Sequence, residues 1–261
     1  MKRQYDPFLT ISIISCSVVS LFIMVPLLQM LFEPSWEIMT ESIVDPDIQK
    51  AIWLSIYSSG LAAFISFIIG TPFAYLLARK SFLGKQLVEG IIDLPIMIPH
   101  PVIGIAILGI VGKHHWLGHF LHSIGVQVMG SVSGIVLVLT FVGMPFYINT
   151  VKNGFESIPV RLENVSRSLG ASFSSTFFRI TLPLAWRSIF VGIILCSARA
   201  ISEFGAVVVV AYHPMNAPVL IYERFTAFGL KYSQPIAVLL ILICLMLFVG
   251  LRLLTQKDRE L

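Results

Sequence analysis

The sequence predicts an all-α, polytopic membrane protein with six transmembrane helices, and its composition and apolar segments support that prediction. Of its 261 residues, 56% are hydrophobic and only 12% are charged, and its mean hydropathy is +0.88. Soluble domains carry about 25% charged residues. Apolar stretches exceed the ~18 residues that suffice to cross a bilayer. Because a backbone in hydrocarbon must satisfy its own hydrogen bonds, each span is expected to be a helix. These observations argue against a soluble enzyme.

The six predicted spans form a single transmembrane domain, residues 1–261. The first span covers about 8–32, and the core spans lie within about 52–254. The core spans are predicted at about 52–78, 91–112, 131–151, 184–211 and 235–254. The N-terminus begins like a signal peptide, but no A-x-A-like cleavage site follows its apolar run, so we expect a retained first span.

Lysine and arginine are distributed unequally between the two sets of loops and ends, which predicts the orientation. Thirteen fall on one side: Lys2, Arg3, Arg79, Lys80, Lys85, Lys152, Arg161, Arg167, Arg179, Arg187, Arg252, Lys257 and Arg259. Four fall on the other: Lys50, Lys113, Arg224 and Lys231. The richer side is expected to be cytoplasmic. The sequence therefore predicts a multi-pass protein of the cell membrane with both termini in the cytoplasm.

Several other classes of function lack support. Cys16, Cys196 and Cys244 lie far apart in apolar stretches, so neither a disulfide framework nor a zinc site is indicated and buried thiols are expected. No basic run with interleaved aromatic residues suggests nucleic-acid binding. A G-x-x-x-x-G-K-[ST] phosphate loop is absent, so any ATP-driven work is expected to come from another polypeptide. No cofactor is expected.

The cytoplasmic loop at about 157–183 is predicted to form two short helices that meet at a glycine. Ser157 can cap the first helix, with Pro159 in its first turn. Gly170 suits the left-handed position that follows such a helix. Ser172 or Ser174 can cap the second helix, and Pro183 is expected to break it before the fifth span.

This loop resembles the cytoplasmic signature of ABC-importer permeases. The segment LENVSRSLGASFSSTFFRITLP (162–183) keeps the spacing from Gly170 to Ile180 and the final Leu-Pro of that signature. It departs from the family where Val165 and Ser166 replace two alanines, and Glu163 lies one residue early. The early Glu163 resembles the molybdate, tungstate and sulfate branch. The segments VEGIIDLPIMIPHPVIGIAI (88–107) and ARAISEFGAVVVVAYHPMNAPVLIYERF (198–225) resemble the same branch.

The resemblance implies a type I ABC-importer permease that works as a dimer, usually of two identical copies. Two cytoplasmic ATPase subunits would dock on the loop, and an external solute-binding protein would deliver the oxyanion. Molybdate or tungstate is the expected substrate, with sulfate or thiosulfate as the alternative. The residues expected to couple the loop to the ATPase are Arg161, Glu163, Arg167, Ser168, Gly170 and Ala171. An ion-coupled secondary transporter would need more intramembrane acids than this chain has. A membrane enzyme would need a motif such as HExxH or GxSxG, which is absent.

Charged residues within the predicted spans are candidates for the translocation pathway or its gate. Arg199 and Glu203, four apart in the fifth span, can pair on one helix face. They line the pathway with Ser202, or they form an ion pair that only holds helices together. Ala198, Ser202 and Ala206, with Gly205 adjacent, recur at a spacing that allows close helix approach or a pathway lined by small residues.

The start of the third span offers two further pathway candidates, Asp93 and Pro99. Pro95, Pro99 and Pro101 remove backbone donors and are expected to kink the helix there, beside His100. Such a break can point backbone groups at an anion. The alternative is a kinked entry into the membrane with Asp93 among the lipid headgroups.

Two external loops carry weaker signals. His114, His115, His119 and His122 have spacings that could bind a metal on a helix, but no carboxylate or cysteine accompanies them, so no metal is expected. By the resemblance, the loop 213–234 helps to seat the solute-binding protein. It is otherwise a plain connection.

Overall fold

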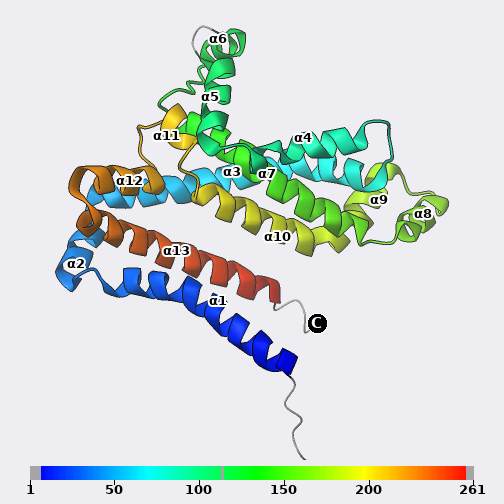
Figure 1. The fold of residues 1–261 in the computed structure, drawn as a ribbon. Coiled ribbons are helices and arrows are strands. Elements are labelled where there is room, and N and C mark those ends of the chain that lie inside the picture. Colours follow the sequence, from blue (N-terminus) through cyan, green and yellow to red (C-terminus); the bar gives the residue numbers. More distant parts are fainter. Residues whose placement is uncertain (1–6, 113–114, 257–261) are drawn as a thin grey trace, which may run out of the picture.

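The computed structural model describes residues 7–112 and 115–256, and this part of the chain is built from helices. Figure 1 shows their arrangement. The helices are α1 (Pro7–Phe32), α2 (Trp36–Val44), α3 (Pro46–Arg79), α4 (Lys85–Met97), α5 (His100–Val111), α6 (Trp116–Ser123), α7 (Val132–Glu156), α8 (Val160–Ser168), α9 (Phe173–Thr176), the π-helical turn η1 (Phe177–Thr181), α10 (Leu182–Ile201), α11 (Val207–Val210), α12 (Ala217–Phe228) and α13 (Leu230–Gln256).

The number of membrane spans agrees with the sequence prediction. Among the described residues, five helices are long and apolar enough to cross a membrane, and α4 with α5 makes a sixth span if this bent pair is counted as one. The all-α, multi-pass prediction is confirmed. Helix α1 lies on the outside of the molecule, with none of its residues buried. Its residue Cys16 is consequently exposed, against the expectation of a buried thiol, whereas Cys196 is buried and Cys244 is half-buried.

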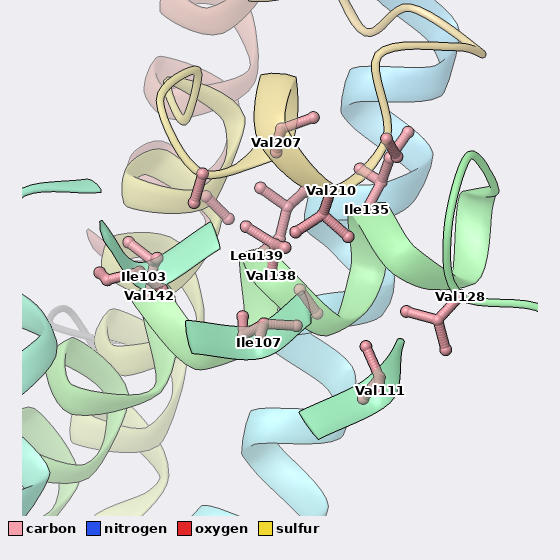
Figure 2. Close-up of a cluster of buried hydrophobic side chains, with 14 of the residues drawn as sticks. Ile103, Ile107, Val111, Val128, Ile135, Val138, Leu139, Val142, Val207 and Val210 are labelled. Atoms are coloured by element: carbon pink, nitrogen blue, oxygen red, sulfur yellow. The ribbon is translucent and has the colours of Figure 1, made fainter. Parts of the chain in front are cut away.

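Helix α7 is the centre of a bundle with α3 and α10 (Figure 1). Two glycines on α7 allow α10 to approach closely, because a Cβ atom on Gly143 would lie 2.7 Å from the Cys196 sulfur and one on Gly154 would collide with Ser188. Figure 2 shows a second part of the core, where Ile103 and Ile107 of α5 meet α7 and α11. The bundle thus fixes where α5 and α10 meet.

The third predicted span is not one straight helix. Helices α4 and α5 are bent by 114° at residues 98 and 99, and α5 points away from the bundle in Figure 1. Pro99 is the N-cap of α5, and Pro101 lies in its first turn, where a missing N–H costs nothing. The prolines therefore end one helix and begin another, which confirms the predicted kink and corrects the predicted continuous span.

The fifth predicted span, 184–211, begins and ends earlier in the structure, at Phe173 and Ile201. Helix α10 ends at Ile201, and only the short α11 follows it. The Glu203 side chain accepts a hydrogen bond from the Ala206 backbone N–H at 2.9 Å. This local bond competes with continuation of the helix. Glu203 therefore lies just beyond α10 rather than within a continuous span.

The glycine corner is confirmed, with corrections at both of its ends. Gly170 has a φ of 90° directly after α8, as predicted, and Ser172 caps α9. Ser157 follows α7, whereas Pro159 occupies the N-cap of α8, so the predicted cap was wrong. Pro183 does not break the second helix. The wider turn η1 leads directly into α10, with the Leu182 N–H bonded to the Phe177 carbonyl, and Pro183 lies in the first turn of α10, where a missing N–H is tolerated.

The two ends of the molecule hold different elements (Figure 1). The last turns of α3 and α7, the first turn of α10 and the pair α8 and α9 lie at one end, and α2 and α12 lie at the other. The start of α1 and the end of α13 point toward the α8 end. The predicted loop 213–234 is largely the helix α12, which packs along α13 and α3.

Candidate functional site

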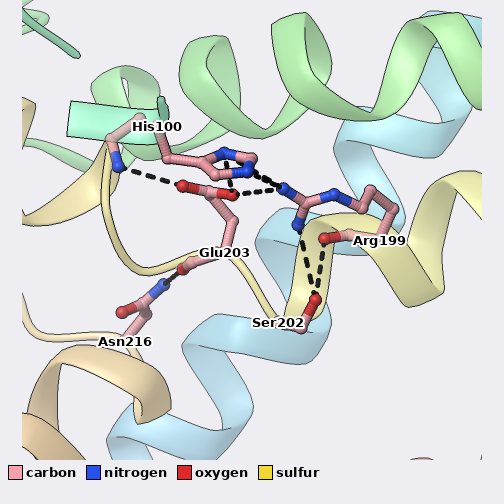
Figure 3. A network of polar contacts seen from close by, with 6 residues as sticks. His100, Arg199, Ser202, Glu203 and Asn216 are labelled. Atoms are coloured by element: carbon pink, nitrogen blue, oxygen red, sulfur yellow. Dashed lines mark hydrogen bonds and ion pairs between the residues drawn. The ribbon is translucent and has the colours of Figure 1, made fainter. Parts of the chain in front are cut away.

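Arg199, Glu203 and His100 form a compact polar cluster where α10 ends and α5 begins (Figure 3). One Glu203 carboxylate oxygen, Oε2, lies 2.9 Å from Arg199 Nη2 and 2.9 Å from His100 Nδ1. The other, Oε1, accepts the Ala206 N–H. Glu203 is only 2% exposed. The predicted Arg199–Glu203 pair is therefore present, with a histidine added to it.

His100 comes to the cluster because the proline break turns α5 toward the end of α10. The start of α5 lies close to the chain that follows α10, since a Cβ atom on Gly205 would lie 2.9 Å from His100 Cβ. Arg199 Nη2 also lies 2.8 Å from His100 Nε2. The same Nη2 lies 3.0 Å from His100 Nδ1, so the guanidinium, the imidazole and the carboxylate are all in contact with one another.

Arg199 keeps donors that the cluster does not fully use. Its Nη1 lies 3.5 Å from the Ser202 hydroxyl, which itself donates to the Arg199 carbonyl. A guanidinium has five N–H groups in a planar fork that suits oxyanions. The Arg199 side chain is 22% exposed, whereas its partner Glu203 is buried. The cluster thus contains a partly exposed cation, Arg199, that is paired with a buried carboxylate, Glu203.

The other pathway candidates are distributed differently. Ser202 touches the cluster, and Pro99 precedes His100 on an exposed turn. Asp93 is not among the cluster's contacts. It accepts a hydrogen bond from Asn149 of α7 at 2.7 Å and is half-buried. Asp93 therefore joins α4 to the bundle.

The proposed stripe of small residues does not form one packed helix face. Ala198 and Ser202 are exposed, whereas Ala206 is buried and lies beyond the helix end. Close approach occurs at Gly205, against His100 and Pro101.

Asn216 is a residue that sequence reasoning did not select. It is buried, its side-chain amide donates to the Glu203 carbonyl at 3.4 Å, and its side chain caps α12 through the Val219 N–H. Asn216 thereby joins the cluster to α12 (Figure 3). An asparagine two residues before a proline was the available sign of a helix cap, but its contact with Glu203 is not visible in the sequence.

The second candidate site is the corner made by α8 and α9. The predicted coupling residues Arg161, Arg167, Ser168 and Gly170 are exposed, and Ala171 is half-buried. A wide-open hollow lies beside Arg167, Gly170 and Phe173. Four apolar side chains of the corner are also exposed: Val160, Leu162, Val165 and Leu169. The outer side of α8 thus combines apolar and cationic groups.

Glu163 differs from the other coupling candidates because it is buried, with 7% of its surface exposed. Its carboxylate accepts hydrogen bonds from Arg79 Nε at 2.8 Å, from the Tyr75 hydroxyl at 2.9 Å and from the Thr181 hydroxyl at 3.1 Å. Both oxygens of Glu163 are therefore engaged inside the chain.

The histidine loop shows no metal-binding arrangement in the part that the structure describes. His114 lies outside the described residues, and His115, His119 and His122 lie on or next to α6. Within residues 7–112 and 115–256, no group of three or more His, Cys, Asp or Glu side chains could hold a metal ion.

Comparison with known proteins gives consistent relatives across the chain. Residues 70–259 match the family described as "Binding-protein-dependent transport system inner membrane component". The chain is 41% identical over 251 residues to the molybdate/tungstate transport system permease protein WtpB of Methanocaldococcus jannaschii, covering 96% of this chain and 97% of that protein. A probable sulfate transport system permease protein cysT of Chlorokybus atmophyticus is 30% identical over 233 residues, covering 88% and 80%.

A solved structure shares the fold. The bacterial alginate ABC transporter in complex with an alginate pentasaccharide-bound periplasmic protein aligns with a TM-score of 0.75, covering 96% of this chain and 95% of that chain. The two sequences are 15% identical. The helical arrangement is thus that of an ABC-importer transmembrane subunit.

Proposed function

This chain belongs to the family of binding-protein-dependent transport system inner membrane components, and we propose that it is the permease subunit of an importer for molybdate or tungstate. The observation that carries the substrate is the 41% identity to a molybdate/tungstate permease over 96% of the chain, against 30% over 88% for a sulfate permease. Sulfate or thiosulfate is the alternative substrate.

ATP hydrolysis is assigned to separate subunits, two per complex, that dock on the corner formed by α8 and α9. The exposed apolar residues of α8, together with Arg161 and Arg167, support this docking surface. Exposed apolar side chains bordered by polar groups are typical of protein interfaces. The sequence contains no phosphate loop of its own. Arg167, Ser168, Gly170 and Ala171 line the hollow beside this surface.

The complete unit is proposed to contain two copies of the chain, each a single transmembrane domain over residues 1–261, in a lipid bilayer. A solute-binding protein would deliver the anion at the outer side, where the end formed by α2 and α12 lies. This orientation, with both termini cytoplasmic, rests on the Lys/Arg excess of the α8 side. The periplasmic protein bound to the alginate transporter supports the external partner by analogy.

The translocation pathway is proposed to pass the cluster of Arg199, Ser202, Glu203 and His100, with Pro99 at the bend. Arg199 can meet an oxyanion through donors that the cluster leaves free, whereas Glu203 reduces its net positive field. Without Glu203, the full positive charge of Arg199 would hold the anion and slow its release. Asp93 supports the pathway through its bond to Asn149, which fixes α4. ATP-driven rocking of the two copies would alternate access.

The proposal is tested by reconstituting the chain with its ATPase and its solute-binding protein in liposomes. We expect ATP-dependent uptake of tungstate and molybdate that requires the loaded binding protein, with much weaker uptake of sulfate. Preferential sulfate uptake would establish the alternative substrate. Uptake driven by an ion gradient without ATP would contradict an ABC importer and favour a secondary transporter.

A further inference from the structure

Glu163 is held on the inner side of α8 by residues that come from distant parts of the chain. Arg79 and Tyr75 lie in the last two turns of α3, and Thr181 ends η1 directly before α10. All three donate to the Glu163 carboxylate, Tyr75 to Oε2 and the other two to Oε1. One buried carboxylate therefore connects α8 to two membrane helices.

Arg79 strengthens this connection at a second point. Its Nη2 donates to the carbonyl of Ile158, just before α8, at 3.1 Å. The side chains of Arg79 and Glu163 are 7% and 9% exposed. Burying an ion pair removes water from both charges, so the pair adds little net stability, but removing one partner leaves the other charge buried and unpaired. Here it fixes the position of α8 against the end of α3.

Aromatic side chains close the space around the connection. The Tyr75 ring packs edge-on against Phe155 at 5.4 Å and Phe177 at 4.9 Å between centroids. The Ser166 and Thr176 hydroxyls, 3.0 Å apart, join α8 to α9. The inner side of α8 is thus packed, and its polar side chains have hydrogen-bond partners, whereas its outer side is exposed.

We infer that Glu163 is a positioning residue that connects the docking corner to α3 and α10, rather than a contact for the ATPase. Displacement of α8 by the ATPase would then move the end of α3 and the start of α10 at the same time, because the Glu163 carboxylate binds Arg79, Tyr75 and Thr181. This inference rests on the proposed function, since it assumes that an ATPase docks on α8. It adds the route by which docking becomes helix movement.

The test uses Glu163→Gln in the full reconstituted complex. Glutamine keeps the size of the side chain but removes the charge that holds Arg79. We expect ATPase association within about twofold of wild type and continued ATP hydrolysis. Tungstate transported per ATP should fall at least about tenfold, a loss of ~1.4 kcal/mol of coupling free energy.

Two further variants keep the test decisive. Thr181→Val removes one donor without leaving an unpaired charge, so it should fold and lose part of the coupling even if Glu163→Gln assembles poorly. Arg161→Gln changes the exposed side of α8, and it should weaken ATPase association while each bound ATPase still transports with normal yield. Opposite effects of the inner and outer variants are the signature of a positioning role.

Loss of ATPase association in Glu163→Gln with a well-folded permease would make Glu163 a docking contact and overturn the inference. Unchanged transport per ATP in both Glu163→Gln and Thr181→Val would overturn it as well. A wild-type complex without ATP-dependent uptake would instead overturn the proposed function on which the inference depends. The wild-type control therefore separates the two failures.

Discussion

Alanine substitutions of Arg199 and Glu203, made singly and together, separate a pathway role from a packing role for this pair. Glu203 is 2% exposed and touches Arg199, His100 and the Ala206 N–H. Breaking a buried pair on one side costs about 3–5 kcal/mol. The Arg199 side chain is 22% exposed, so we expect about 3 kcal/mol for each single variant, the lower end of that range.

The double variant should cost less than the sum of the single variants, because neither charge is left alone. We expect a coupling free energy of about 2 kcal/mol, as interacting neighbours show. The measurement is the free energy of unfolding of all four proteins in detergent, made together with tungstate uptake in liposomes. A pathway role predicts that the double variant folds but takes up tungstate at least about tenfold more slowly, a barrier increase of ~1.4 kcal/mol.

Strictly additive single effects would refute the pairing on which both roles depend. A double variant that is stable and transports at the wild-type rate would leave the pair a purely structural contact. His100 provides an internal control, since it touches both partners. His100→Ala should lower stability less than either single variant, because it removes neither Arg199 nor Glu203 and leaves their ion pair intact.

Three further outcomes are expected. In a cysteine-free background, a cysteine replacing Thr40 should react with an impermeant thiol reagent from outside intact cells and one replacing Ser172 only from inside, and reversed labelling at both would refute the orientation. Gly170→Val should lower ATPase association or coupled transport, because a φ of 90° costs a residue with a side chain about 1–2 kcal/mol. Gly170→Asn should be tolerated better, and normal transport in both variants would show that the corner geometry is not needed. Leu169→Asp should abolish most ATPase association without altering the thermal stability of the permease, since Leu169 is 84% exposed; unchanged association in a pull-down would place the docking surface elsewhere.

Local signals in the sequence predicted the features that depend on local geometry. The positive φ of Gly170 follows from a short helix that must end, and glycine adopts that conformation at least cost. The bend before α5 follows from Pro99 and Pro101, which are compatible with a helix start but not with its interior. The spans followed from apolar length alone.

Features that depend on distant partners were not predictable in the same way. His100 meets Arg199 from 99 positions away in the sequence, and Arg79 meets Glu163 from 84. The end of α10 was hidden because the apolar residues after Glu203 extend the hydropathic run, although the backbone leaves the helix. The prediction at Pro183 was wrong because a proline ordinarily ends a helix. In the structure the wider turn η1 precedes it, and the chain stays helical.

Helix α10 connects the polar site around Glu163 to the polar cluster around Arg199. It begins directly after Thr181, which donates to Glu163, and Arg199 lies in its last turn. Its 20 residues form one continuous helix that spans about 30 Å. Close contacts between Gly143 and Cys196, and between Gly154 and Ser188, hold it against α7. If Glu163 holds the start of α10 as inferred above, a shift imposed on Glu163 is expected to reach Arg199, because the backbone from Leu182 to Ile201 is one continuous helix.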